Sequence, residues 1–221
     1  MKLASRREAD TLIAEGKVLV NGKPAVIGQK VTATDKVTLK GERAKKTYLA
    51  YYKPRGVITH SPATGETDIA MKLMQDYKIS GVSPIGRLDK DSEGLILLCN
   101  DGRVTGPLLD PEAHHEKVYD VLLDKEISNH FLRHMETGVN IEGYLTRPAT
   151  VVKKNAKRFH ITLTEGKKHQ IRRMCAALGY QVQALKRIRI EHIELGKLTP
   201  NQYRKLTTEE IATLLSSLGL K

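Results

Sequence analysis

The stretch SPIGRLDKDSEGLILLCNDG, residues 83–102, places four acidic side chains around a short apolar run. The run at 95–99 is typical of a buried strand, and residues 86–91 are typical of a tight loop that leads into it. Loops supported by a rigid sheet often carry reactive groups. A loop carboxylate here is therefore a candidate nucleophile, general base or metal ligand, with a simple turn residue as the alternative.

The charge of the chain is positive and unevenly distributed. It has 37 Lys and Arg against 25 Asp and Glu, a net charge of +12. Residues 1–47 hold eleven basic and five acidic residues, and residues 153–190 hold eleven basic residues and one acid. Two such regions favour a polyanionic partner, and nucleic acid before a membrane. A solvated basic surface is the alternative interpretation.

The cysteines and the hydropathy indicate a cellular compartment. Cys99 and Cys175 lie far apart among apolar residues, so we expect reduced core residues and no metal site. No apolar run approaches the about 20 residues of a membrane helix, and no signal-peptide pattern begins the chain. These features predict a soluble, cytoplasmic protein.

The first part of the chain predicts a small helix and a hairpin. A capping box at residues 5–8 starts the helix, and Gly16 ends it. Short strands are predicted at 17–20 and 36–39, and an Asn21-Gly22 turn follows the first of them.

The remainder predicts an α+β domain. Its strands and helices mix without a βαβ rhythm, which favours a largely antiparallel mixed sheet flanked by helices. The predicted strands are 48–53, 93–100, 116–123, 150–154, 158–164 and 181–195. The predicted helices are 67–77, 128–137, 168–178 and 207–218. The predicted domain boundaries are 1–41 for a small α/β domain, 42–47 for a polar linker and 48–221 for the α+β domain.

The residues after 166 predict a helix whose first turns are rich in basic side chains. Apolar residues at 171, 174, 175 and 178 mark the buried face, so the cations project elsewhere, where they suit phosphate contacts. A solvated basic helix is the alternative. His169 has no second ligand at a usable spacing, so we expect no metal site there.

A metal-dependent nuclease is one alternative for the loop acids. Asp89 and Asp91, two residues apart, could hold Mg²⁺. Arg87 and Lys90 would compete with a metal for these carboxylates, which disfavours this interpretation.

The motifs together resemble a known family. Residues 84–89, followed by 92–98 and 100–102, are similar to the signature of RsuA-like pseudouridine synthases, which isomerise uridines in ribosomal RNA. Three further segments match motifs of this family in the expected order, namely 53–56, 115–119 and 166–174. The wording of the signature looks closest to large-subunit enzymes that modify a single site.

The N-terminal residues resemble the S-four RNA-binding domain that often precedes this catalytic domain. The matching segments are 5–10 and 18–22. Family members usually have another helix before the first segment, so the domain is expected to be N-terminally shortened.

The resemblance implies catalytic roles for three residues. Asp89 would be the essential carboxylate that stabilises or traps the anomeric carbon, or removes the neighbouring sugar proton. Arg172 would be its ion-pair partner, and Tyr119 would lie against the flipped uracil. Supporting positions in the pocket would be Gly86, Leu88, Lys117 and Ile171. Asp91, Glu93 and Asp101 match no catalytic position and are expected to be turn, cap or surface acids.

The expected partner is RNA, which would bind basic residues from both charged regions and the loops. The candidate RNA-binding residues are Arg6, Arg7, Lys23, Lys53, Arg55, Arg87, Lys167, Lys168 and Arg173. An isomerisation needs no electron carrier or group donor, so neither a cofactor nor a metal is implied, and we expect a monomer.

The sequence therefore predicts an enzyme that isomerises a uridine to pseudouridine in structured RNA, most readily large-subunit ribosomal RNA. Transfer RNA is an alternative substrate. A non-catalytic RNA-binding or ribosome-assembly protein, in which Asp89 is structural, is the main alternative function.

Overall fold

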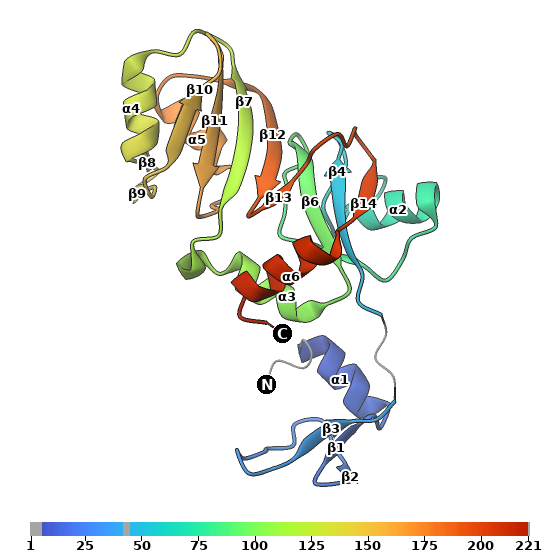
Figure 1. Ribbon diagram of the computed structural model, residues 1–221. Coiled ribbons are helices and arrows are strands. Elements are labelled where there is room, and N and C mark those ends of the chain that lie inside the picture. The colour runs from blue at the N-terminus through green and yellow to red at the C-terminus, as the bar shows by residue number, and fades with distance from the viewer. Residues whose placement is uncertain (1–5, 42–44, 221) are drawn as a thin grey trace.

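The computed structural model describes residues 6–41 and 45–220. Within them, a three-stranded sheet near the N-terminus precedes a nine-stranded sheet, and a two-stranded ribbon lies beside the large sheet (Figure 1). The large sheet has the order β10-β11-β7-β12-β6-β4-β14, with β13 paired to β12 and β5 paired to β6. Its pairings are antiparallel except for β6 with β12 among the named strands. The predicted α+β class with a largely antiparallel mixed sheet is confirmed.

The elements have the following bounds. The strands are β1 Val18–Val20, β2 Lys23–Pro24, β3 Val37–Leu39, β4 Tyr48–Lys53, β5 Ser83–Ile85, β6 Glu93–Cys99, β7 Lys117–Leu123, β8 Asn140–Ile141, β9 Tyr144–Leu145, β10 Thr150–Lys153, β11 Arg158–Leu163, β12 Val182–Ile190, β13 Ile193–Glu194 and β14 Tyr203–Lys205. The helices are α1 Arg6–Ala14, α2 Ile69–Tyr77, α3 Gly102–Leu109, α4 Asn129–Thr137, α5 Gln170–Ala177 and α6 Thr208–Ser217, with a short 3-10 turn at Pro111–Ala113. None of the described helices is long and apolar enough to cross a membrane.

Strand β6 is apolar from Leu95 to Cys99, where both of its faces are covered. Leu95 and Leu97 belong to a core that α3 and α6 complete, whereas Ile96 and Leu98 belong to a second core that α2 completes. A strand that is buried on both sides loses the polar alternation of a half-exposed strand. The apolar run in the opening stretch is thus the centre of the domain.

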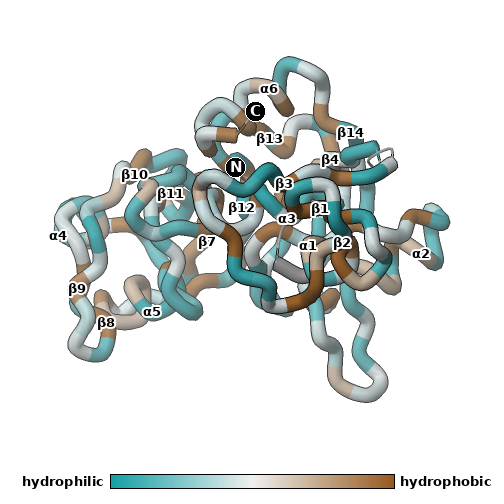
Figure 2. Tube along the Cα trace, turned by 90° about the horizontal axis from the view of Figure 1, so that it is seen from below, coloured by the Kyte–Doolittle hydropathy of each residue, from teal (hydrophilic) through white to brown (hydrophobic). Residues whose placement is uncertain are grey.

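The other half of the sheet has its own core. Phe131 of α4 packs edge-on against Phe159 of β11 at a centroid distance of 5.4 Å, and Met174 of α5 joins the same cluster. Seen from below, α4, α5, β10 and β11 lie to one side of the domain and α2, β4 and β14 to the other (Figure 2). The strands β6, β7 and β12 link the two halves.

The single parallel pairing depends on a glycine. Gly94 pairs with Arg187 where β6 meets β12 and has φ +105. A Cβ at this position would lie 2.3 Å from the Arg187 carbonyl oxygen, closer than a side chain can approach. The glycine that follows Glu93 in the signature is therefore a requirement of this close strand contact.

Several elements differ from the sequence-based expectations. The strands β5, β8, β9 and β14 were not predicted, because each is only two or three residues long. The predicted strand at 181–195 is divided into β12 and β13 by a turn in which Glu191 has φ +50. Helix α3 was not predicted, because Gly106 and Pro107 both disfavour a helix. Its N-cap Asp101 accepts from the backbone N–H of Arg103, which starts the helix despite that composition.

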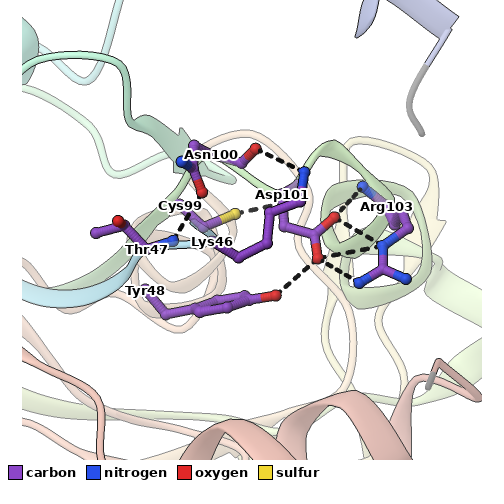
Figure 3. A network of polar contacts seen from close by, with 7 residues as sticks. All are labelled: Lys46, Thr47, Tyr48, Cys99, Asn100, Asp101 and Arg103. Carbon is purple, nitrogen blue, oxygen red and sulfur yellow. Dashed lines mark hydrogen bonds and ion pairs between the residues drawn. The ribbon is translucent and has the colours of Figure 1, made fainter. Parts of the chain in front are cut away.

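The acid at the end of β6 is a structural cap. Asp101 is buried and accepts hydrogen bonds from the Tyr48 hydroxyl (2.7 Å) and the Arg103 guanidinium (2.7 Å) (Figure 3). Burial raises the pKa of Asp101, but the bonds from Arg103 and Tyr48 outweigh it and lower the pKa to about 2. The neighbouring Asn100 accepts from the Thr47 N–H, so this turn also holds the start of β4.

The N-terminal sheet has a small core of its own. Val18, Val20 and Ala25 are buried and α1 packs against them. Asn21 and Gly22 have φ +52 and +80, the conformation expected for a tight hairpin turn. The capping box predicted at residues 5–8 begins outside the described residues.

Candidate active site

A cavity of about 330 Å³ opens between the 86–91 loop, strand β7 and the residues before α5. Several predicted site residues contribute to its wall, from segments far apart in the sequence. These are Gly86, Arg87, Leu88, Asp89, Lys117, Tyr119, Lys167, Lys168 and Ile171.

The loop that carries Asp89, residues 87–91, is held through every one of its backbone carbonyls. The Asp89 carbonyl accepts from the Ser92 N–H (3.1 Å), and the Lys90 carbonyl accepts from the Gly56 N–H (2.8 Å). Side chains from other elements hold the remaining three carbonyls. The donors are Arg187 to Arg87 (3.4 Å), Thr59 to Leu88 (2.7 Å) and Arg172 to Asp91 (3.2 Å). This network fixes the backbone on both sides of Asp89.

Thr59 makes the closest side-chain contact in this network. Its buried hydroxyl donates to the Leu88 carbonyl and accepts from the Leu88 N–H at 3.0 Å. Both peptide groups of the residue before Asp89 are therefore bonded to one side chain.

Lys53 was expected to contact RNA, and the structure corrects this expectation. Its side chain is fully buried at the end of β4. The ammonium donates to the carbonyls of Val57 (2.7 Å) and Pro54 (3.0 Å) and approaches that of Lys90 (3.5 Å). Burial lowers the pKa of Lys53 to about 8, while the charge of Asp89 opposes this shift. Lys53 thus joins the 54–57 turn to the 87–91 loop, and its ammonium is buried away from solvent.

The structure does not bring Arg172 to Asp89 in the way the resemblance implies. Arg172 donates to the Asp91 carbonyl and to the Val182 carbonyl (3.2 Å). Among the described side chains, the basic group within ion-pairing distance of Asp89 is His169, with 3.4 Å between Nε2 and Oδ1. Arg172 therefore supports the 87–91 loop through the Asp91 carbonyl, and His169 faces the carboxylate of Asp89.

Tyr119 and Lys117 project from β7 toward the cavity. Tyr119 lies in register with Arg187 of β12, so the phenol and the guanidinium come from adjacent strands. Lys117 donates to the His115 carbonyl at 2.9 Å. Burial lowers the pKa of Lys117, and the nearby Arg187 lowers it further. Tyr119 supplies an aromatic face beside a group of partly buried cations.

Arg187 is the buried cation of this wall. Its Nε donates to the Leu95 carbonyl at 2.7 Å, and its Nη2 has no hydrogen-bond partner within residues 6–41 and 45–220. A buried guanidinium next to the cavity raises the local positive potential.

A buried acid shapes the segment before α5. Glu165 accepts from the Tyr144 hydroxyl (2.5 Å), the Gln170 amide (2.6 Å) and the Arg147 N–H (3.0 Å). Gln170 in turn accepts from the Lys167 N–H at 2.9 Å. These bonds tie residues 165–170 to strand β9, so the segment that faces Asp89 has a fixed path.

The other predicted RNA contacts occupy different surroundings. Lys23, Arg55, Arg87 and Lys168 are exposed. Lys167 is exposed and its ammonium lies 4.5 Å from the centre of the Tyr144 ring. Arg173 lies outside the cavity wall and pairs with Glu142 at 2.7 Å. The side chains of Arg6 and Arg7 fall outside the part of the chain whose side chains are described.

The pocket positions include one close approach and two apolar side chains. Gly86 has φ +76, and a Cβ there would lie 3.0 Å from Leu109 Cδ2. Leu88 and Ile171 are buried and present apolar surface to the cavity. Within the described residues, no group of three or more His, Cys, Asp or Glu side chains is placed to hold a metal.

Three residues of the site were not predicted from the sequence, and each left a different signal. Arg187 occupies an inward position of β12, two residues after buried Leu185, which marks it as unusual for a cation. Thr59 carries no such signal, because its partner is a backbone group 29 residues away. His169 was expected only as one of the cationic residues at the start of the helix and not as a metal ligand, because its contact with Asp89 joins segments that are distant in sequence.

The arrangement suits chemistry at an electron-poor carbon. One carboxylate, on a loop with a fixed backbone, shares a cavity with an aromatic side chain and is surrounded by cations. Such a carboxylate can stabilise or capture positive charge at an anomeric carbon. The exposed cations at the rim suit the phosphates of a nucleic acid.

Comparisons with known proteins agree with this geometry. Residues 47–177 match the family model of RNA pseudouridylate synthases, and residues 1–37 match the S4 domain. The chain is 40% identical over 218 residues to the dual-specificity RNA pseudouridine synthase RluF of Salmonella typhi, covering 96% of this chain and 74% of the relative. It is 36% identical over 225 residues to ribosomal large subunit pseudouridine synthase B of Bacillus subtilis, covering 96% and 91%.

A solved structure extends the similarity to the fold. A crystal structure of a pseudouridylate synthase superposes with a TM-score of 0.73 at 28% identity, covering 95% of this chain and 94% of that one. The arrangement of strands is therefore shared. This chain belongs to the RNA pseudouridylate synthase family, as an RNA-modifying isomerase that carries an S4 RNA-binding domain.

Proposed function

We propose that this enzyme isomerises a specific uridine in large-subunit ribosomal RNA and that Asp89 is its essential carboxylate. The observation that carries the proposal is the position of Asp89, on a loop with a clamped backbone, in a cavity that Tyr119 also lines. The side chain of Asp89 is 39% exposed, so a nucleotide can reach it.

The reaction exchanges one glycosidic bond for another. The bond between uracil N1 and the ribose anomeric carbon breaks, the base turns, and a bond forms between the anomeric carbon and C5. The proton on C5 leaves, and a proton is taken up at N1, so the product has the atoms of the substrate. Asp89 either bonds to the anomeric carbon during the exchange or removes the neighbouring sugar proton.

The surrounding residues have separate roles in this scheme. Tyr119 stacks on the flipped uracil and is placed to take part in moving the C5 proton. The uridine has to leave its stack, which costs a few kcal/mol that phosphate contacts at Arg87, Lys167 and Lys168 offset. Ile171 provides an apolar wall for the base.

The choice of ribosomal RNA rests on the relatives. One relative is named for the large ribosomal subunit, and another is named for dual specificity. Both large-subunit RNA and transfer RNA are therefore offered as substrates in the test. Mapping of pseudouridines in RNA from cells with and without the protein identifies the modified nucleotide.

Asp89→Asn is the decisive variant. It removes the charge and keeps the size of the side chain, so we expect pseudouridine formation to fall below detection while RNA affinity changes by less than about threefold. Thermal unfolding should be unchanged because the side chain is partly exposed. Product formation by the variant at the wild-type rate would contradict the proposal.

The same assay separates the alternatives. A non-catalytic RNA-binding protein would bind RNA and form no pseudouridine in the wild type. A metal-dependent nuclease would cleave the strand, and EDTA would stop it. The proposed enzyme leaves the RNA intact and is insensitive to EDTA.

A further inference from the structure

His169 is the basic side chain that meets the catalytic loop at its carboxylate. Its Nε2 lies 3.4 Å from Asp89 Oδ1, and both side chains line the cavity. The His169 side chain is 47% exposed, so it stands at the rim where substrate enters. None of the other motif residues discussed above has this position.

The backbone at His169 is unusual and directs the side chain. Its φ of +52 and ψ of +28 place the backbone in the left-handed region, which residues other than glycine rarely adopt. It occupies the N-cap position of α5, yet its side chain makes no capping hydrogen bond. The imidazole is therefore available to the cavity. A left-handed residue that persists at a site of this kind indicates that its side-chain direction matters.

The cations that might replace His169 at Asp89 are engaged elsewhere. Arg172 donates to the carbonyls of Asp91 and Val182, and Lys117 donates to the His115 carbonyl. Arg187 donates to the Leu95 and Arg87 carbonyls. Each of these groups donates hydrogen bonds to backbone carbonyls, whereas His169 lies against the carboxylate of Asp89.

We propose that His169 is a positioning residue for the uridine isomerisation. The imidazole pairs with Oδ1 of Asp89 and fixes the rotation of the carboxylate, so that Oδ2 faces the anomeric carbon. This inference rests on the proposed function of Asp89 and adds the partner that orients it. The physical reason is that the reaction rate falls steeply when a reacting group is displaced from its productive position.

Two substitutions test the role. His169→Asn removes the imidazole but keeps a residue that tolerates the left-handed backbone. His169→Arg restores a permanent cation at the same place. Single-turnover rates and RNA dissociation constants are measured for both, with thermal unfolding as a check on folding. The matched control is His192→Gln. His192 is an exposed histidine that contacts the Glu210 carbonyl and does not line the cavity.

We expect His169→Asn to lower the single-turnover rate by about 10- to 100-fold with the RNA dissociation constant within about twofold of wild type. His169→Arg should recover most of the rate, and His192→Gln should behave as wild type. An unchanged rate in His169→Asn would overturn the inference. So would a weaker RNA affinity with an unchanged rate, because that result identifies a phosphate contact.

The failure of this inference is distinct from failure of the proposed function. A wild-type protein that forms no pseudouridine contradicts the assignment of Asp89. A wild-type protein that forms pseudouridine, with His169→Asn equally active, contradicts the role of His169 alone.

Discussion

Thr59 holds both peptide groups of Leu88, the residue immediately before Asp89. The hydroxyl donates to the Leu88 carbonyl at 2.7 Å and accepts from the Leu88 N–H at 3.0 Å. A side chain from the 54–60 segment therefore sets the position of a reactive group on another loop. The two segments are further joined by the Gly56 N–H and by Lys53.

Thr59→Val keeps the shape of this side chain and removes the hydroxyl. Two buried backbone groups lose their partner, so we expect a loss of about 1–3 kcal/mol in the free energy of unfolding. The reaction rate should fall by about 10- to 100-fold, because Asp89 is no longer fixed, while RNA affinity is retained. Thr59→Ser keeps the hydroxyl and is the control. Equal rates in the two variants would argue against positioning by this hydroxyl.

The lowered pKa of Lys53 predicts that the free energy of unfolding changes with pH in the alkaline range. Its pKa is about 8 in the folded protein and close to 10.5 when unfolded, so the unfolded chain binds more protons between these values. The contribution of Lys53 to the free energy of unfolding therefore rises with pH between these two pKa values. Compared with Lys53→Met, the wild type should gain about 2 kcal/mol between pH 8 and pH 10. Chemical denaturation of both proteins at each pH measures the difference, and a constant difference would contradict the prediction.

Asp101 makes the free energy of unfolding rise with pH as well, but in the acid range. Its pKa of about 2 lies below the usual 3.8, so its contribution is full above pH 4 and is lost as the pH falls toward 2. Asp101→Asn removes the buried charge that Arg103 contacts and should cost about 3 kcal/mol at pH 7. Asp68→Asn, at the N-cap of α2, should cost little because asparagine caps equally well. Similar losses in the two variants would contradict the assignment.

The close approach of β12 to Gly94 predicts that a side chain at this position destabilises the fold. Gly94→Ala places a Cβ against the Arg187 backbone, so we expect a loss of about 3 kcal/mol or more. Gly143→Ala is the matched control, since Gly143 also has a positive φ (+86) but open space around it, and should cost about 1 kcal/mol. Thermal or chemical unfolding gives both values. Equal costs would show that backbone conformation, not the approach of β12, requires the glycine.

Much of this architecture could be predicted from local patterns. The alternation at 158–164 and the capping box of α6 report local periodicity and hydrogen bonding, and the structure confirms both. Helix α3 could not be predicted, because a single buried cap overrides the poor helix propensity of Gly106 and Pro107.

The site shows the same division. The position of Asp89 followed from one continuous motif, whereas Thr59 and Arg187 reach its loop across 29 and 100 residues of sequence. The expected contact of Lys53 with RNA was wrong because a cation at the end of an apolar strand can be buried when carbonyls surround it. Such pairings of side chain with distant backbone leave no spacing that a sequence could reveal.

The bonding of the catalytic loop has a consequence for how the enzyme changes over time. Every carbonyl from Arg87 to Asp91 already has a donor inside the protein. The backbone of this loop therefore offers an RNA no carbonyl without a donor of its own, and we expect recognition of a target to depend on the exposed side chains around the rim and on the S4 domain. Under this proposal, substitutions at the surface would change the choice of nucleotide and leave the loop intact.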